Sequence, residues 1–93
     1  MTPDLKTRIL VHCDSNAEIR RMSDMLRDWI RAVNPNHTVA VLNTTTIYAG
    51  SEMVEIIHSE KLAIKKQGAR WDEIVSGSKM EEIIKRATQK GGN

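Results

Sequence analysis

The chain has very little cysteine, and this scarcity excludes one class of redox site. Cys13 is the one thiol among 93 residues, so no intramolecular disulfide can form, and a single thiol fits a reducing compartment. A Cys-x-x-Cys centre needs a resolving cysteine three residues after the first, and Asn16 stands at that position. The chain therefore cannot carry out dithiol redox chemistry.

Long apolar runs are also missing from the sequence. No stretch of about 18 apolar residues occurs, so the sequence predicts no membrane-spanning helix. Residues 1–6 are too few and too polar for a signal peptide or a presequence. With no internal repeat and no linker, we expect residues 1–93 to form one domain.

Charge is distributed unevenly along the chain. The first 60 residues carry 6 basic and 8 acidic side chains, whereas residues 61–93 carry 8 basic and 4 acidic ones. A basic carboxy-terminal third could face phosphate groups, although a run of charges is more often a solvated surface.

The first half of the chain predicts a strand, a helix and a second strand. Arg8–Cys13 is apolar on both faces, as in a central strand. Ser15 and Glu18 form a capping box at the start of a helix with one apolar stripe, and Asn34-Pro35 ends it. His37–Leu42 predicts a second strand, which a helical crossover would pair in parallel with the first.

The second half contains one ambiguous segment. Asn43–Gly50 reads as a loop or a fraying strand end. Glu52–Gln67 fits a hairpin that turns at His58–Lys61, and it also fits a helix; we favour the hairpin. Ser78 and Glu81 form a second capping box, which predicts a carboxy-terminal helix.

Three stretches resemble a set of small mitochondrial proteins with a thioredoxin-like fold and no redox activity. They are Arg8–Cys13, Val33–Val39, and Met53–Lys61 followed by the helix pattern Met80–Ile84. The pattern is most similar to the large-subunit mitochondrial ribosomal protein numbered fifty-three, and next to the thioredoxin-like accessory subunit of respiratory complex I. The resemblance implies an α/β fold, in which a single thioredoxin-like domain has a mixed four-stranded sheet (β-α-β-β-β-α) and two helices.

The resemblance also implies a function. We expect a non-catalytic structural component of the mitochondrial large ribosomal subunit, located in the mitochondrial matrix and docked on ribosomal RNA and neighbouring ribosomal proteins. The alternative is an accessory subunit in the matrix arm of complex I. Neither role involves a small-molecule substrate or a cofactor.

The candidate contact residues are basic or aromatic and lie in the last third of the chain. Phosphate groups would be contacted by basic side chains, and an exposed tryptophan could anchor on a partner or stack on a base. Trp29 lies near the apolar stripe of the first helix and is more typical of a core residue. The predicted contact set is Lys61, Lys65, Lys66, Arg70, Trp71 and Lys79.

Cysteine and histidine give two weaker candidates for chemistry. Cys13 at the end of a strand is reminiscent of phosphocysteine-carrying phosphotransferase domains, but Asp14 and Glu18 would repel a phosphate there, and we expect a half-buried structural cysteine. His12, His37 and His58 could join Cys13 on a metal, but His12 and Cys13 point to opposite faces of their strand. We therefore predict no catalytic and no metal site.

Overall fold

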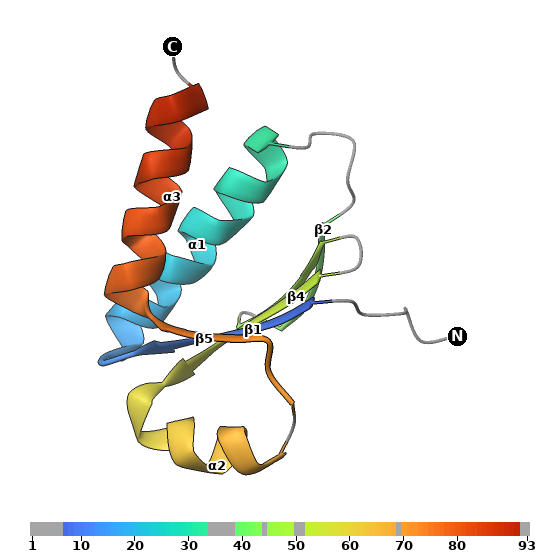
Figure 1. Cartoon of the computed structure of the whole chain (residues 1–93), viewed down its shortest axis with the longest axis vertical. Helices are drawn as coiled ribbons and strands as arrows, with labels where there is room; N and C mark the ends of the chain where they lie inside the picture. Colours follow the sequence, from blue (N-terminus) through green and yellow to red (C-terminus); the bar gives the residue numbers. More distant parts are fainter. Residues whose placement is uncertain (1–6, 34–38, 44, 50–51, 69, 92–93) are drawn as a thin grey trace.

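One five-stranded sheet organises the molecule, with helices on both of its faces (Figure 1). The computed structural model describes residues 7–33, 39–43, 45–49, 52–68 and 70–91. The elements in chain order are β1 (Thr7–Cys13), α1 (Asn16–Val33), β2 (Val39–Asn43), β3 (Thr46–Ala49), β4 (Glu52–His58), the 3₁₀ turn η1 (Ser59–Lys61), α2 (Leu62–Gly68), β5 (Glu73–Ser76) and α3 (Gly77–Gly91).

The sheet is mixed, and β1 lies inside it. The strand order is β2-β3-β4-β1-β5. β1 pairs in parallel with β4 along its whole length, from Thr7 opposite Glu52 to Cys13 opposite His58, and in parallel with β5 on its other edge. The antiparallel pairs β2·β3 and β3·β4 complete the sheet. Leu10 and Val11 point to opposite faces and are both fully buried, as expected for an interior strand.

The first helix begins as the sequence predicts. The Ser15 side chain accepts the backbone N–H of Glu18 at 3.1 Å, and the Glu18 carboxylate accepts the backbone N–H of Asp14 at 2.7 Å. These bonds satisfy backbone donors that the helix itself leaves without a partner. α1 ends at Val33, just before Asn34-Pro35, which lies outside the described residues.

The segment 52–67 is neither the hairpin nor the helix that the sequence suggested. It forms strand β4, then η1, then α2. β4 buries Met53 and Val54 on alternate faces, as well as Ile56 and Ile57, because helices cover both sides of the sheet there. The predicted return strand is helical instead, and Ile64 on it is 73% exposed.

Two further predictions about the strands are corrected. The Asn43–Gly50 stretch contains β3, which pairs with both β2 and β4. After the crossover through α1, β2 lies at the edge of the sheet. β3 and β4 separate it from β1, so β1 and β2 do not pair. The antiparallel run β2-β3-β4 returns the chain to the centre, and β4 takes the place beside β1 that we expected for β2.

The fold class itself is confirmed. The protein is α/β with a mixed sheet, compatible with a small thioredoxin-like domain, and it has five strands and three α-helices where four and two were expected. The strands that were not predicted are β3 and β5, and α2 replaces the predicted return strand. Together α2 and β5 cross from β4 past β1 to the opposite edge.

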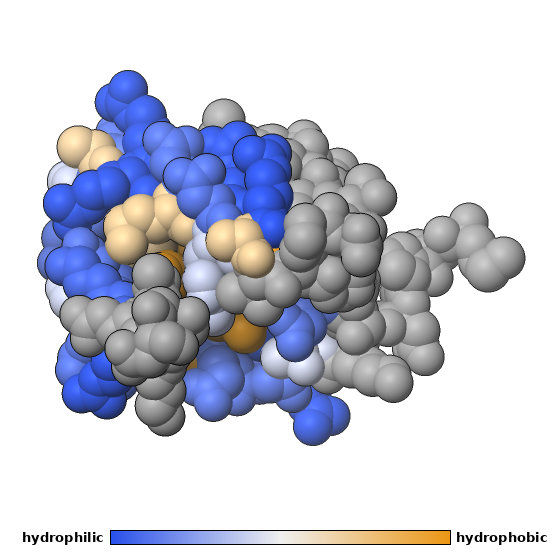
Figure 2. Space-filling model, turned by 90° about the horizontal axis from the view of Figure 1, so that it is seen from above, coloured by the Kyte–Doolittle hydropathy of each residue, from blue (hydrophilic) through white to orange (hydrophobic). Residues whose placement is uncertain are grey.

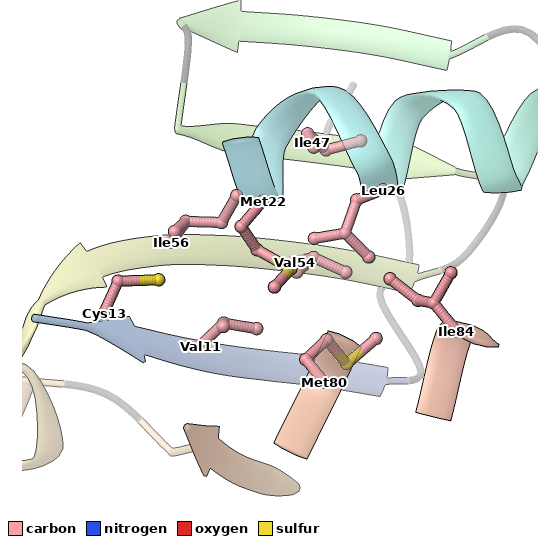
Figure 3. Close-up of a cluster of buried hydrophobic side chains, with 9 residues drawn as sticks. All are labelled: Val11, Cys13, Met22, Leu26, Ile47, Val54, Ile56, Met80 and Ile84. Carbon is pink, nitrogen blue, oxygen red and sulfur yellow. The ribbon is translucent and has the colours of Figure 1, made fainter. Parts of the chain in front are cut away.

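The main core lies between the sheet and the helix pair α1 and α3 (Figure 3). Arg21 of α1 and Glu81 of α3 form an ion pair at 3.1 Å that links the two helices. The buried cluster contains Val11, Cys13, Met22, Leu26, Ile47, Val54, Ile56, Met80 and Ile84. Half-buried Trp29 packs against it, as expected for a residue near the apolar stripe.

Seen from above, the coloured surface is mostly hydrophilic (Figure 2). Apolar residues show in it as a few small separate patches. The apolar stripes of α1 and α3 mostly pack against each other and against the sheet.

Candidate functional site

Two neighbouring parallel strands end side by side, and the chain leaves them toward opposite faces of the sheet. After β1 it enters α1 on one face, and after β4 it enters η1 and α2 on the other (Figure 1). In open α/β sheets, ligands bind in the crevice outside the carboxyl ends of strands whose connections diverge in this way. The fold therefore directs attention to the ends of β1 and β4.

A cavity of about 760 Å³ lies next to this position, along the second half of β4 and the first turns of α1. We call it the strand-end crevice. Its walls come from the first turns of α1, the start of β3, the second half of β4, and η1 with α2. The lining residues are Asn16, Ile19, Arg20, Thr45, Thr46, Glu55, Ile56, Ile57, His58, Lys61 and Lys65.

The Ser59 hydroxyl joins the ends of β1 and β4 beside the crevice. The Ser59 oxygen lies 3.0 Å from the carbonyl oxygen of Cys13, 2.9 Å from Asp14 Oδ1 and 3.4 Å from His12 Nδ1. A hydroxyl has one proton, so it donates to one of the two oxygens while its lone pairs face the others. This contact holds η1 against the end of β1, beside the crevice.

His58 presents one ring nitrogen for use in the crevice. Its Nδ1 accepts the backbone N–H of Glu60 at 3.2 Å and so caps η1. The proton of the neutral ring is therefore on Nε2, where it can be donated to an acceptor.

The crevice is basic. Arg20 and Lys61 are exposed, whereas the third cation, Lys65, contacts Glu55 with 2.5 Å between Nζ and Oε2. Among the described residues, Glu55 is the only acid that lines the crevice, and Lys65 neutralises it. Arg20, Lys61 and the His58 N–H can thus bind an anion, together with the Asn16 amide and the Thr46 hydroxyl.

The structure divides the predicted contact residues into three groups. Lys61 and Lys65 line the crevice. Lys66 and Arg70 are exposed on α2 and just after it, and we call these four residues the α2 basic face. Lys79 is exposed in the first turn of α3, on the other side of the sheet from α2 (Figure 1).

Trp71 is occupied by contacts within the chain. Its Nε1 donates to the carbonyl oxygen of Lys65 at 3.1 Å, and the Arg8 guanidinium lies 5.1 Å from its ring centre. The Arg8 and Asp72 backbones also bond to each other, with Asp72 N–H donating to Arg8 O at 2.9 Å. The half-buried tryptophan therefore attaches the end of α2 to β1.

Cys13 is placed poorly for nucleophilic chemistry. It is 1% exposed, more deeply buried than the expected half-buried cysteine. Burial, assisted by Glu18 and Asp14, raises the pKa of its thiol to about 11, so the reactive thiolate is scarce near neutral pH. A methyl group on Gly77 would lie 2.9 Å from the sulfur and 2.8 Å from the Glu18 carboxylate, which shows how closely α3 covers it.

The described residues contain neither a metal-binding cluster nor a membrane-spanning helix. No group of three or more His, Cys, Asp or Glu side chains is placed to hold a metal ion there. None of the helices in that part of the chain is long and apolar enough to cross a membrane.

Residue patterns missed Asn16, Arg20 and His58 as crevice residues. Asn16 was considered only in place of a resolving cysteine, Arg20 only as part of a charged helix face, and His58 only as a turn residue or a metal ligand. The signal that could have found them is positional: they follow or end strands that turn out to be parallel neighbours. That signal required β4 to be recognised as a partner of β1, and the hairpin interpretation prevented it.

Comparisons with protein-family models, with curated proteins and with solved structures gave no match to this chain.

Proposed function

We propose that this protein is a non-catalytic RNA-docking domain whose α2 basic face contacts phosphate groups. The observation that carries the proposal is the position of exposed Lys61, Lys66 and Arg70 on or next to one short helix beside a basic crevice, with Lys65 between them paired to Glu55. Lysine and arginine side chains on one face bind a phosphate backbone by releasing condensed counterions. Such contacts position a domain on RNA without reading its sequence.

The larger context that we propose is the mitochondrial large ribosomal subunit, in the mitochondrial matrix. Support for this assignment comes from the three sequence stretches that resemble its thioredoxin-like components. The deep burial of Cys13 and the raised pKa of its thiol support a role without thiol chemistry. Sedimentation of native extract tests the assignment: we expect co-migration with the large ribosomal subunit, and co-migration with respiratory complex I would replace it with the matrix-arm alternative.

RNA docking is tested with a matched pair of double variants. Lys66→Gln with Arg70→Gln removes two charges from the α2 basic face, and neither residue lines the crevice. Lys85→Gln with Arg86→Gln removes the same charge from α3, where both residues are exposed and make only surface ion pairs. Such surface pairs contribute little to stability, so both variants should fold.

We expect the α2 variant to bind single-stranded RNA several-fold more weakly than the parent. Each lost phosphate contact lowers the slope of log K against log salt by about 0.7, so two contacts lower it by roughly 1.4. The α3 variant should keep the parental slope. Equal losses in the two variants, or no loss in either, would contradict docking through the α2 basic face.

A further inference from the structure

The strand-end crevice is larger and more varied in chemistry than a phosphate contact requires. Its volume of about 760 Å³ lies within the range of about 300–1,000 Å³ that is typical of small-molecule sites. A single phosphate group would fill only a part of it. The remaining volume has room for the rest of a larger ligand.

The open side of the crevice follows from the lengths of the strands. β3 pairs with β4 from Glu52 to Glu55, and Thr45 adds one bond to the Ile56 N–H at 2.8 Å. Ile57 and His58 continue past the start of β3, and the strand that the structure pairs with them is β1, on the other edge. Their β3-side edge thus faces the crevice, which a flat ligand can enter from the rim of the sheet.

The walls provide three kinds of contact. Arg20, Lys61 and the Nε2–H of His58 can hold an anion. Asn16 and Thr46 carry an amide and a hydroxyl, which can bond to the edge of a base or to a sugar. Half-buried Ile19 offers an apolar surface, and the planar Arg20 guanidinium can also stack on an aromatic ring.

We infer that the strand-end crevice binds one nucleoside phosphate. The phosphate lies toward Lys61 and His58 at the end of β4, and the base lies along the α1 wall at Ile19 and Arg20. The nucleotide arrives either free or as an unpaired residue of an RNA strand. The second source rests on the proposed function, and the first does not.

Direct titration with a nucleoside monophosphate tests this inference. The probes are UMP and AMP, with inorganic phosphate as the reference, followed by calorimetry or by amide chemical shifts. We expect both nucleotides to bind at least ten-fold more tightly than phosphate, because phosphate alone leaves the base-facing walls empty.

The matched variants are Arg20→Gln and Arg31→Gln. Both remove an exposed arginine from α1, but Arg31 lies three turns further along the helix and outside the crevice. We expect Arg20→Gln to weaken UMP binding about ten-fold, and Arg31→Gln to leave it unchanged. Equal binding by both variants, or nucleotides no tighter than phosphate, would overturn the inference.

Competition separates the two sources and keeps this inference distinct from RNA docking. A single-stranded oligonucleotide that displaces UMP identifies an unpaired RNA residue as the ligand, and an oligonucleotide that leaves UMP bound identifies a free nucleotide. Failure of UMP to bind overturns the crevice inference, while the salt slope of the Lys66 and Arg70 variant still decides RNA docking.

Discussion

The two faces of the sheet are covered to very different degrees. On one face, α1 with 18 residues and α3 with 15 residues pack against each other and against the sheet. On the other face, α2 has 7 residues, and none of them is buried. The long helices therefore build most of the core, whereas the short helix mainly presents lysines and closes one side of the crevice.

This difference separates stability from binding. Burial of apolar surface by α1 and α3 is the main favourable contribution in so small a domain. Residues on α2 contribute little burial, and its surface can carry charge at small cost to the fold. Ligand sites are commonly built on elements that contribute little to stability, at the edge of a rigid scaffold.

The largest expected effect comes from truncating the core on the α1 face. Leu26 is 1% exposed within the main cluster, so Leu26→Ala should lower the free energy of unfolding by about 2–5 kcal/mol. Ile64→Ala on α2 removes a side chain of the same size that is 73% exposed, and we expect a change below about 0.5 kcal/mol. Urea unfolding measures both, and comparable losses would show that α2 is as important to the fold as α1.

A smaller effect is expected from a pair of glycine substitutions that makes the same comparison. Gly77→Ala places a methyl group against the Cys13 sulfur and the Glu18 carboxylate, and such overpacking costs about 1–3 kcal/mol. Gly68 has no neighbouring atom within 4 Å of an added methyl group, so Gly68→Ala should stabilise the protein by up to about 1 kcal/mol.

Thermal or urea unfolding of the two alanine variants provides the measurement. We expect the free energy of unfolding to fall in Gly77→Ala and to rise in Gly68→Ala. A neutral Gly77→Ala would mean that the start of α3 is not tightly packed on β1 and α1.

Local signals in the sequence predicted the elements of the α1 face well. The capping pair Ser15 and Glu18, the apolar stripe of α1 and the doubly apolar Arg8–Cys13 strand all act within a few residues of one another, and each is present in the structure. The second capping pair, Ser78 and Glu81, was wrong, since α3 begins at Gly77 and it is Ser76 that accepts the Lys79 N–H at 3.2 Å; the carboxy-terminal helix itself is confirmed.

The partner of β1 depended on long-range pairing, which periodicity does not encode. Met53–Ile57 contains alternating and consecutive apolar residues and fits a strand or a helix equally well. Only the location of β4 beside β1, with helices on both faces, requires all four apolar side chains to be buried. The same uncertainty concealed the crevice, because its walls come from segments that meet through that pairing.

Amide chemical shifts during titration with a single-stranded oligouridine test most directly the claim that α2 and the strand-end crevice bind, including the first turns of α1, while the packed lengths of α1 and α3 stabilise the fold. We predict that the largest shifts occur at Asn16, His58 and Lys61, with smaller ones along α2. Amides of α3 from Lys79 to Arg86 should move little. Shifts concentrated on α3, or spread evenly over both faces of the sheet, would contradict this division.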